Sequence, residues 1–284
     1  MPTTKVKLLA LALTALSSTA ASAASYTSGD LLLGFVAGSG DGSNETLVIN
    51  LGSAAVFRDG FDSGTVQINF ENIGTELTTQ FGSGGTPWYE RTDLYISLFG
   101  STASDTIGDT LVNGDPFRTV YASRPRQGED AIPSLFTINS NTAITTTSGQ
   151  IVSTSGVFAG SASNANGVSI IPDAANTLDK FTKPLASNSF TNLSGGIEQA
   201  FGTGTWGSFS ATGPVEAALD LQRIQAVNNI PGQYGEGALN RRGDFTGTFT
   251  INNAGDISFI PEPSTSGVLL LTGLASLVRR RRRA

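Results

Sequence analysis

Short β-favouring runs separated by turn residues are the feature that most constrains the fold of this 284-residue chain. Runs rich in Val, Ile, Leu, Thr and Phe recur between clusters of Gly, Asn, Asp and Ser, a spacing typical of antiparallel β-sandwiches and barrels. The runs cover residues 31–36, 46–51, 65–70, 93–99, 117–122, 135–139, 156–159, 245–251 and 257–260. The sequence therefore predicts a mainly β protein whose body is a single β-sandwich or barrel-like domain.

Turn residues and weaker periodicities complete the expected outline. Residues 252–255, Asn-Asn-Ala-Gly, predict a hairpin between the last two runs, and residues 40–44 predict a turn between the first two. Residues 215–227 fit a helix loosely and alternate as a strand, so we favour a strand. Residues 140–167, rich in Ser and Thr, predict either a flexible surface excursion or a repetitive β edge. The few short helices are expected at 74–81, 174–181 and 197–201.

Composition excludes several classes of function. The chain has no cysteine and no histidine, which excludes disulfides, Cys nucleophiles, Ser-His-Asp triads and the usual zinc sites. Residues 24–261 carry 22 acidic and 10 basic side chains, a net charge of −12 that repels nucleic-acid phosphates. We therefore expect no nucleic-acid partner and no cofactor, and, because no catalytic motif is recognisable, a protein that is not an enzyme.

The N-terminus has the order of a cleavable signal peptide. Two lysines precede an apolar stretch at residues 8–16, and the small residues Ala21 and Ala23 follow at the positions that signal peptidase requires. This pattern predicts that residues 1–23 are removed and that the mature protein begins at Ala24. The Sec translocon and signal peptidase are the partners it implies.

The C-terminus combines three ordered features within residues 261–284. They are the motif Pro261, Glu262, Pro263, Ser264 and Thr265, an apolar run at 267–278, and the cluster Arg279, Arg280, Arg281, Arg282 and Arg283. The prolines hold the motif extended, and the arginines resist crossing a membrane. This tail resembles the PEP-CTERM sorting signal, a tail type also described as an ice-binding protein C-terminal domain.

The resemblance implies how the protein is exported and processed, and it implies no activity. It implies an exosortase-like membrane protease as partner, which cleaves near the Pro-Glu-Pro, in a Gram-negative host that often makes exopolysaccharide or biofilm matrix. The precursor would reside transiently in the inner membrane, and the mature form at the cell surface or outside the cell. Residues 24–260 form the passenger, the part of the chain that is exported. It resembles the passengers of other proteins with this tail, whose function is unknown. The apolar run would span only ~18 Å as a helix, against ~30 Å of hydrocarbon, so it makes a marginal anchor.

Two functions remain open for the passenger. The first is an exported, non-catalytic cell-surface or extracellular-matrix protein, and the alternative is a secreted carbohydrate-binding or carbohydrate-cleaving protein. Aromatic side chains that sugar rings could stack on, or that could instead fill the core, are Trp88, Tyr89, Tyr95, Tyr121 and Trp206. A groove lined by aromatic residues with converging carboxylates would favour the alternative.

Acidic residues supply the remaining site candidates. Asp105, Asp109, Asn113 and Asp115 offer oxygen ligands of the kind calcium prefers, but their spacing departs from an EF-hand loop and also fits solvated turns. Calcium is therefore the weaker of these two interpretations. The carboxylate pairs that a glycosidase would need could be formed by Glu90 with Asp93, or by Asp115 with Glu129.

Overall fold

The computed structural model describes residues 22–59, 72–82, 85–102, 114–126, 128, 131–138, 141–164, 167–172, 199–200, 215–225 and 241–261. Eleven strands in these residues form one sheet of antiparallel pairs. They are β1 (Ser22–Ala23), β2 (Asp30–Ala37), β3 (Glu45–Ser53), β4 (Leu94–Ser101), β5 (Val120–Pro125), β7 (Ala162–Ser163), β8 (Val168–Pro172), β9 (Gln199–Ala200), β10 (Val215–Ile224), β12 (Asp244–Asn252) and β13 (Ile257–Pro261).

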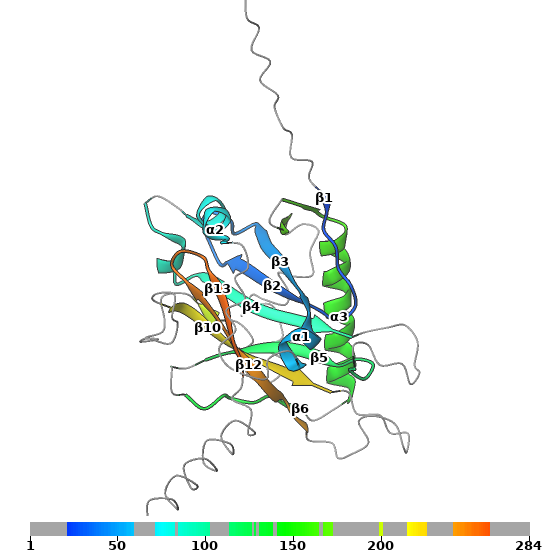
Figure 1. Ribbon diagram of the computed structural model, residues 1–284. Helices are drawn as coiled ribbons and strands as arrows, with labels where there is room; N and C mark the ends of the chain where they lie inside the picture. The colour runs from blue at the N-terminus through cyan, green and yellow to red at the C-terminus, as the bar shows by residue number, and fades with distance from the viewer. Residues whose placement is uncertain are drawn as a thin grey trace, which may run out of the picture.

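The strand order is β1-β7-β8-β3-β2-β4-β5-β10-β12-β13, with β9 pairing to β4 beside this path. Figure 1 labels the longer strands of this sheet. A separate small sheet pairs β6 (Thr137–Ile138) with β11 (Arg241–Arg242). The helices are α1 (Ala54–Asp59), α2 (Gly74–Phe81), the 3₁₀ turn η1 (Trp88–Glu90) and α3 (Asn141–Ala159). The prediction of a mainly β protein with short helices is therefore confirmed at this level.

The finer prediction of a β-sandwich or barrel-like domain goes beyond what the described residues show. In the described residues β1 and β13 are the two ends of the main sheet and do not pair, so the sheet is open. Both faces of this one sheet are apolar, and helices pack on them in place of a second sheet. A sheet that buries each face under helices needs neither closure nor a facing sheet.

One face holds the larger core, formed by β2, β3, β4, β10, β12 and β13 together with α1, α2 and Trp88. Phe57 of α1 lies with its ring 5.0 Å from that of Phe249 and 5.2 Å from that of Phe259, which ties α1 to β12 and β13. Tilted and edge-on ring contacts of this kind add to the free energy of burying the rings. On this face of the sheet, therefore, α1, α2 and η1 pack against the strands.

The other face packs against α3, the longest described helix (Figure 1). Its buried apolar side chains Ile144, Ile151 and Phe158 recur every seven residues and lie on Leu32, Phe99 and other residues of the sheet. The buried Ser148 hydroxyl lies 2.7 Å from that of Ser101 on β4. Small polar residues at this interface let the helix approach the strands closely.

The helix α3 contradicts two predictions. Residues 156–159 are helical rather than a strand, and residues 141–159 are neither a surface excursion nor a β edge. Ser, Thr and Gly have modest helix propensity, so local preference did not indicate this helix, and the sheet face stabilises it. The expected helix at 197–201 is also wrong for its described part, since Gln199–Ala200 forms β9.

Most local predictions are confirmed. Helix α2 covers residues 74–81 as expected, β10 is a strand, and Ile251 pairs with Ile257 across the predicted hairpin turn, where Gly255 has φ +85°. The turn at 40–44 joins β2 and β3. The expected strand at 65–70 and helix at 174–181 lie outside the described residues. No helix in the described ranges is both long and apolar enough to cross a membrane.

Candidate functional site

A polar groove opens where α2, η1 and the β12–β13 turn meet. Its volume is about 700 Å³, within the ~300–1,000 Å³ of small-ligand sites. Its threonine and asparagine side chains are Asn72, Thr75, Thr78, Thr79, Thr86 and Asn253, and Trp88 and Tyr89 also line it. None of the described lining residues is an aspartate, glutamate, lysine or arginine. We call this feature the polar groove.

Two glycines hold the first turn of α2 against the β12–β13 turn. A Cβ on Gly74 would lie 2.2 Å from the Ala254 carbonyl oxygen, and one on Gly255 would lie 2.3 Å from the Gly74 nitrogen. The Asn72 side-chain amide also donates to Asp256 at 3.0 Å. Only glycine permits such close contact of the two backbones, so this wall of the groove is set by residue type.

Arg91 fixes the other wall. Its guanidinium donates to the carbonyl oxygens of Ser39 (2.6 Å), Asp41 (2.8 Å) and Phe81 (2.8 Å), and pairs with Asp93 at 3.0 Å. One buried cation thus connects η1 to the C-terminal end of α2 and to the β2–β3 turn, a position where a positive charge also suits the helix dipole. The hydrogen bond from Arg91 lowers the pKa of Asp93 to about 2.

Several polar groups in the groove remain available to a ligand. The hydroxyls of Thr78 and Thr79 donate to carbonyl oxygens within α2 at 2.6 and 2.8 Å, but their oxygens can still accept. Of the described residues that line the groove, Thr75, Thr86, Tyr89 and Asn253 form no side-chain hydrogen bond. The groove therefore offers neutral donors and acceptors.

The aromatic candidates separate into core and groove residues. Tyr121 is fully buried, Trp206 lies outside the described residues, and Tyr95 is half-buried on β4, paired with Val36 and Ala200. Trp88 is 2 % exposed, and its ring packs edge-on against that of Tyr89 with centroids 5.4 Å apart. Tyr89 is half-buried and is the candidate best placed to present a ring to the groove.

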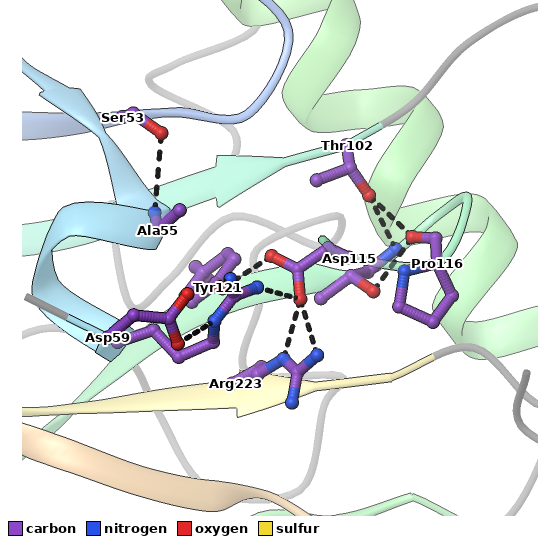
Figure 2. Close-up of polar contacts among 10 residues, drawn as sticks. Ser53, Ala55, Asp59, Thr102, Asp115, Pro116, Tyr121 and Arg223 are labelled. Carbon is purple, nitrogen blue, oxygen red and sulfur yellow. Dashed lines mark hydrogen bonds and ion pairs between the residues drawn. The ribbon is translucent and has the colours of Figure 1, made fainter. Parts of the chain in front are cut away.

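A second polar feature, the Asp115 cluster, lies beside α1 and joins β5 to β10. Figure 2 shows Asp115 between Tyr121 and Arg223. The carboxylate is 2 % exposed, and one of its oxygens lies 2.6 Å from guanidinium nitrogens of Arg58 and of Arg223. The other oxygen accepts from the Tyr121 hydroxyl at 2.6 Å. Burial, together with this hydrogen bond, raises the pKa of Tyr121.

The cluster is close to electrically balanced. Arg58 also binds Asp59, whose carboxylate is 60 % exposed, and that hydrogen bond raises the pKa of Arg58 and lowers that of Asp59. Two cations therefore face two anions, one buried and one exposed. Such an arrangement connects α1, β5, β10 and the segment that carries Asp115, and leaves no excess charge to attract an ion.

The calcium candidates are only partly described. Both oxygens of Asp115 contact other side chains, so a cation there would compete with two guanidinium groups. Asp105, Asp109 and Asn113 lie outside the described residues, and calcium binding stays a prediction. In the described ranges, no three Asp or Glu side chains come together as a metal site would require.

The glycosidase pairs do not converge in the polar groove. Asp93 pairs with Arg91, exposed Glu90 is absent from the described lining, and Glu129 lies outside the described residues. Sequence reasoning missed Arg91 and the threonines of α2. The signal was present for the threonines, because residues 75, 78 and 79 have the spacing of one helix face.

Of the residues predicted to form the signal-cleavage and sorting sites, the structure describes only Ala23, Ala24 and Pro261. Ala23 pairs with Ala162, the Ala24 amide donates to the Ser161 carbonyl at 3.0 Å, and Pro261 ends β13 opposite Gly247. Ala21, the tail from Glu262 onward and the arginines at 279–283 lie outside the described residues. Comparisons of the chain with protein-family models, with curated proteins and with solved structures found no match.

Proposed function

We propose that this chain is an exported, non-catalytic cell-surface or extracellular-matrix protein, sorted by exosortase-type processing of its tail. The observation that carries the proposal is the order of Pro-Glu-Pro, apolar run and five arginines, which begins at Pro261, the last residue of β13, the last strand in the described residues. A signal-peptide pattern at the opposite end strengthens it. Neither a buried helix nor a nucleic-acid-binding run accounts for the Pro-Glu-Pro motif at that position.

The physics of the tail supports a temporary anchor. A membrane protease needs an extended substrate, and prolines on both sides of Glu262 disfavour helix and remove backbone donors. The arginines stay on the cytoplasmic side, and their long side chains compensate for the short apolar run. Cleavage near the motif would then separate the passenger from the membrane.

The folded N-terminal end adds a condition on the order of events. Residues 22–24 pair with the segment just after α3, and Ala24 is 7 % exposed. A peptidase must bind the residues around the scissile bond in an extended, accessible form. The proposal therefore requires cleavage after Ala23 while residues 22–24 are still unpaired. Because this cleavage removes β1 (Ser22–Ala23), the mature protein keeps only the Ala24 contact with Ser161.

The composition of the passenger suits this environment. Its net charge of −12 supports solubility outside the cell, and a body without cysteine needs no oxidative folding. The described polar groove carries no pair of carboxylates. These features favour a role in binding or structure over a reaction.

Precursor processing tests the proposal. A tagged full-length chain is expressed in a host with an exosortase-type protease, and its size and its membrane fraction are followed. We expect Glu262→Ala with Pro263→Ala to leave a membrane-bound, uncleaved precursor. Replacing the five arginines by glutamine removes the topological stop, so uncleaved precursor should instead leave the membrane fraction.

Matched substitutions away from the tail serve as the control. Glu90→Ala with Pro133→Ala changes the same residue types within the passenger and should leave processing normal. Normal processing in both tail variants would refute the sorting role. A mature N-terminus near Met1 rather than at Ala24 would refute export by signal-peptide cleavage.

A further inference from the structure

We propose that the polar groove between α2, η1 and the β12–β13 turn binds a segment of a neutral polysaccharide. This inference deepens the proposed extracellular role and rests on it, because a polysaccharide chain is a ligand encountered outside the cell. Its physical basis is nevertheless separate from the tail. It consists of the chemistry, charge and rigidity of the groove.

The hydrogen-bonding groups of the groove match those of a sugar. Sugar hydroxyls both donate and accept, and the available groups of Thr75, Thr86, Tyr89 and Asn253 do the same. The hydroxyl oxygens of Thr78 and Thr79 add acceptors along one face of α2. A ligand rich in hydroxyls can satisfy these groups without bringing a charge.

An aromatic ring supplies the apolar part of the site. The half-buried Tyr89 ring lies at the groove, and Trp88 packs edge-on against it at an angle of 87°. This contact restricts how the Tyr89 ring can turn. A fixed, flat apolar surface beside neutral hydrogen-bonding groups suits the two faces of a sugar ring.

Charge selects neutral over anionic chains. The described lining contains no lysine or arginine, and the passenger as a whole carries a net charge of −12. A polyanion would be repelled over the distance at which the field of the protein acts. The absence of carboxylates from the same described lining favours binding over glycoside cleavage, which needs two of them.

The walls of the groove are preorganised. Gly74 and Gly255 bring α2 and the β12–β13 turn into backbone contact, and Arg91 holds η1 to the end of α2 through three carbonyl oxygens. A ligand therefore does not have to order these segments when it binds. Less of its interaction free energy is lost in doing so.

Titration calorimetry tests the inference with the purified full chain in detergent micelles. The probes are cellohexaose, maltohexaose and chitohexaose as neutral chains, and an alginate hexamer as the anionic comparison. We expect at least one neutral probe to bind with 1:1 stoichiometry and the alginate hexamer not to bind. Binding of alginate alone, or of none of the neutral probes at millimolar concentration, would overturn the proposal.

Substitutions then locate the site. Thr86→Val removes one hydroxyl with little change of shape and should weaken binding about three- to tenfold. Tyr89→Ala should weaken it about tenfold or more, and Tyr89→Phe, which keeps the ring and the fold, about three- to tenfold. Thr92→Val, at an exposed threonine absent from the described lining, is the matched control and should bind as wild type.

Wild-type affinity in both Thr86→Val and Tyr89→Phe would place the ligand elsewhere and refute the assignment. The groove variants should be cleaved normally in the processing assay. A failure of glycan binding is therefore distinguishable from a failure of the sorting proposal, since the two assays measure different events.

Discussion

Neutralising Asp115 tests whether a buried ion cluster connects the elements of this fold. In Asp115→Asn, the amide oxygen can still accept from the Tyr121 hydroxyl, but the negative charge between Arg58 and Arg223 is lost. The two guanidinium groups, which are 14 % and 18 % exposed, then face each other without the buried anion. We expect the folded state to lose most of the stabilisation that the Asp115 cluster provides.

The burial of the Asp115 carboxylate sets the expected loss in the free energy of unfolding. Removing one partner of a buried ion pair typically costs about 3–5 kcal/mol, because the remaining charge is left without compensation. For a domain of this size each kcal/mol lowers Tm by about 2–4 °C, so Tm should fall by about 6–20 °C. Asp59→Asn is the matched control, since it removes the exposed carboxylate that binds the same Arg58, and should cost less than about 1 kcal/mol.

Urea unfolding followed by far-UV circular dichroism measures both variants, and constant m-values would show that the unfolded states are comparable. Arg223→Met completes a double-mutant cycle with Asp115→Asn, in which we expect a coupling of about 1–3 kcal/mol. Equal destabilisation by Asp115→Asn and Asp59→Asn would refute the reasoning. A coupling near zero would do so as well.

Four further measurements address the core, the groove, acid stability and calcium. Ile151→Ala, in fully buried α3 packing, should cost about 2–5 kcal/mol in urea, whereas Val152→Ala, which is 39 % exposed, should cost less than about 0.5 kcal/mol. Gly255→Ala should lower Tm and abolish oligosaccharide binding, because its Cβ would collide with Gly74. The pKa of Asp93 is lowered from 3.8 to about 2, so its ion pair should stabilise the fold above pH 3.8 and lose that contribution as the pH falls through 2; Asp93→Asn should lack this step in a plot of Tm against pH. Adding calcium should leave Tm unchanged, because both oxygens of Asp115 are already engaged, and a rise would support the acidic-loop candidate.

Sequence alone determined those parts of the molecule whose signals are local. Short β-favouring runs between turn residues predicted β2, β3, β4 and β12, and the Asn-Asn-Ala-Gly turn predicted the hairpin that leads into β13. The prediction that the two end segments are targeting signals rests on the same kind of local evidence, the order of charges, apolar residues and prolines, and it stays a prediction. Each of these features involves residues that are neighbours along the chain.

The helix α3 marks the limit of local prediction. Its Ser, Thr and Gly residues favour a loop by propensity, yet Ile144, Ile151 and Phe158 have a helical repeat that becomes decisive only when the sheet face is present to bury it. The open sheet has the same origin. Whether strands close into a barrel or are covered by helices depends on what else packs on their faces, which strand patterns do not reveal.

The candidate sites depend wholly on the tertiary structure. Arg58, Asp115 and Arg223 are far apart in sequence and meet only because β5 and β10 pair and α1 packs beside them. The polar groove likewise requires Gly74 and Gly255 to bring two distant backbones into contact. Ion pairs and grooves act over a few ångströms, and long-range packing alone brings these side chains within that distance.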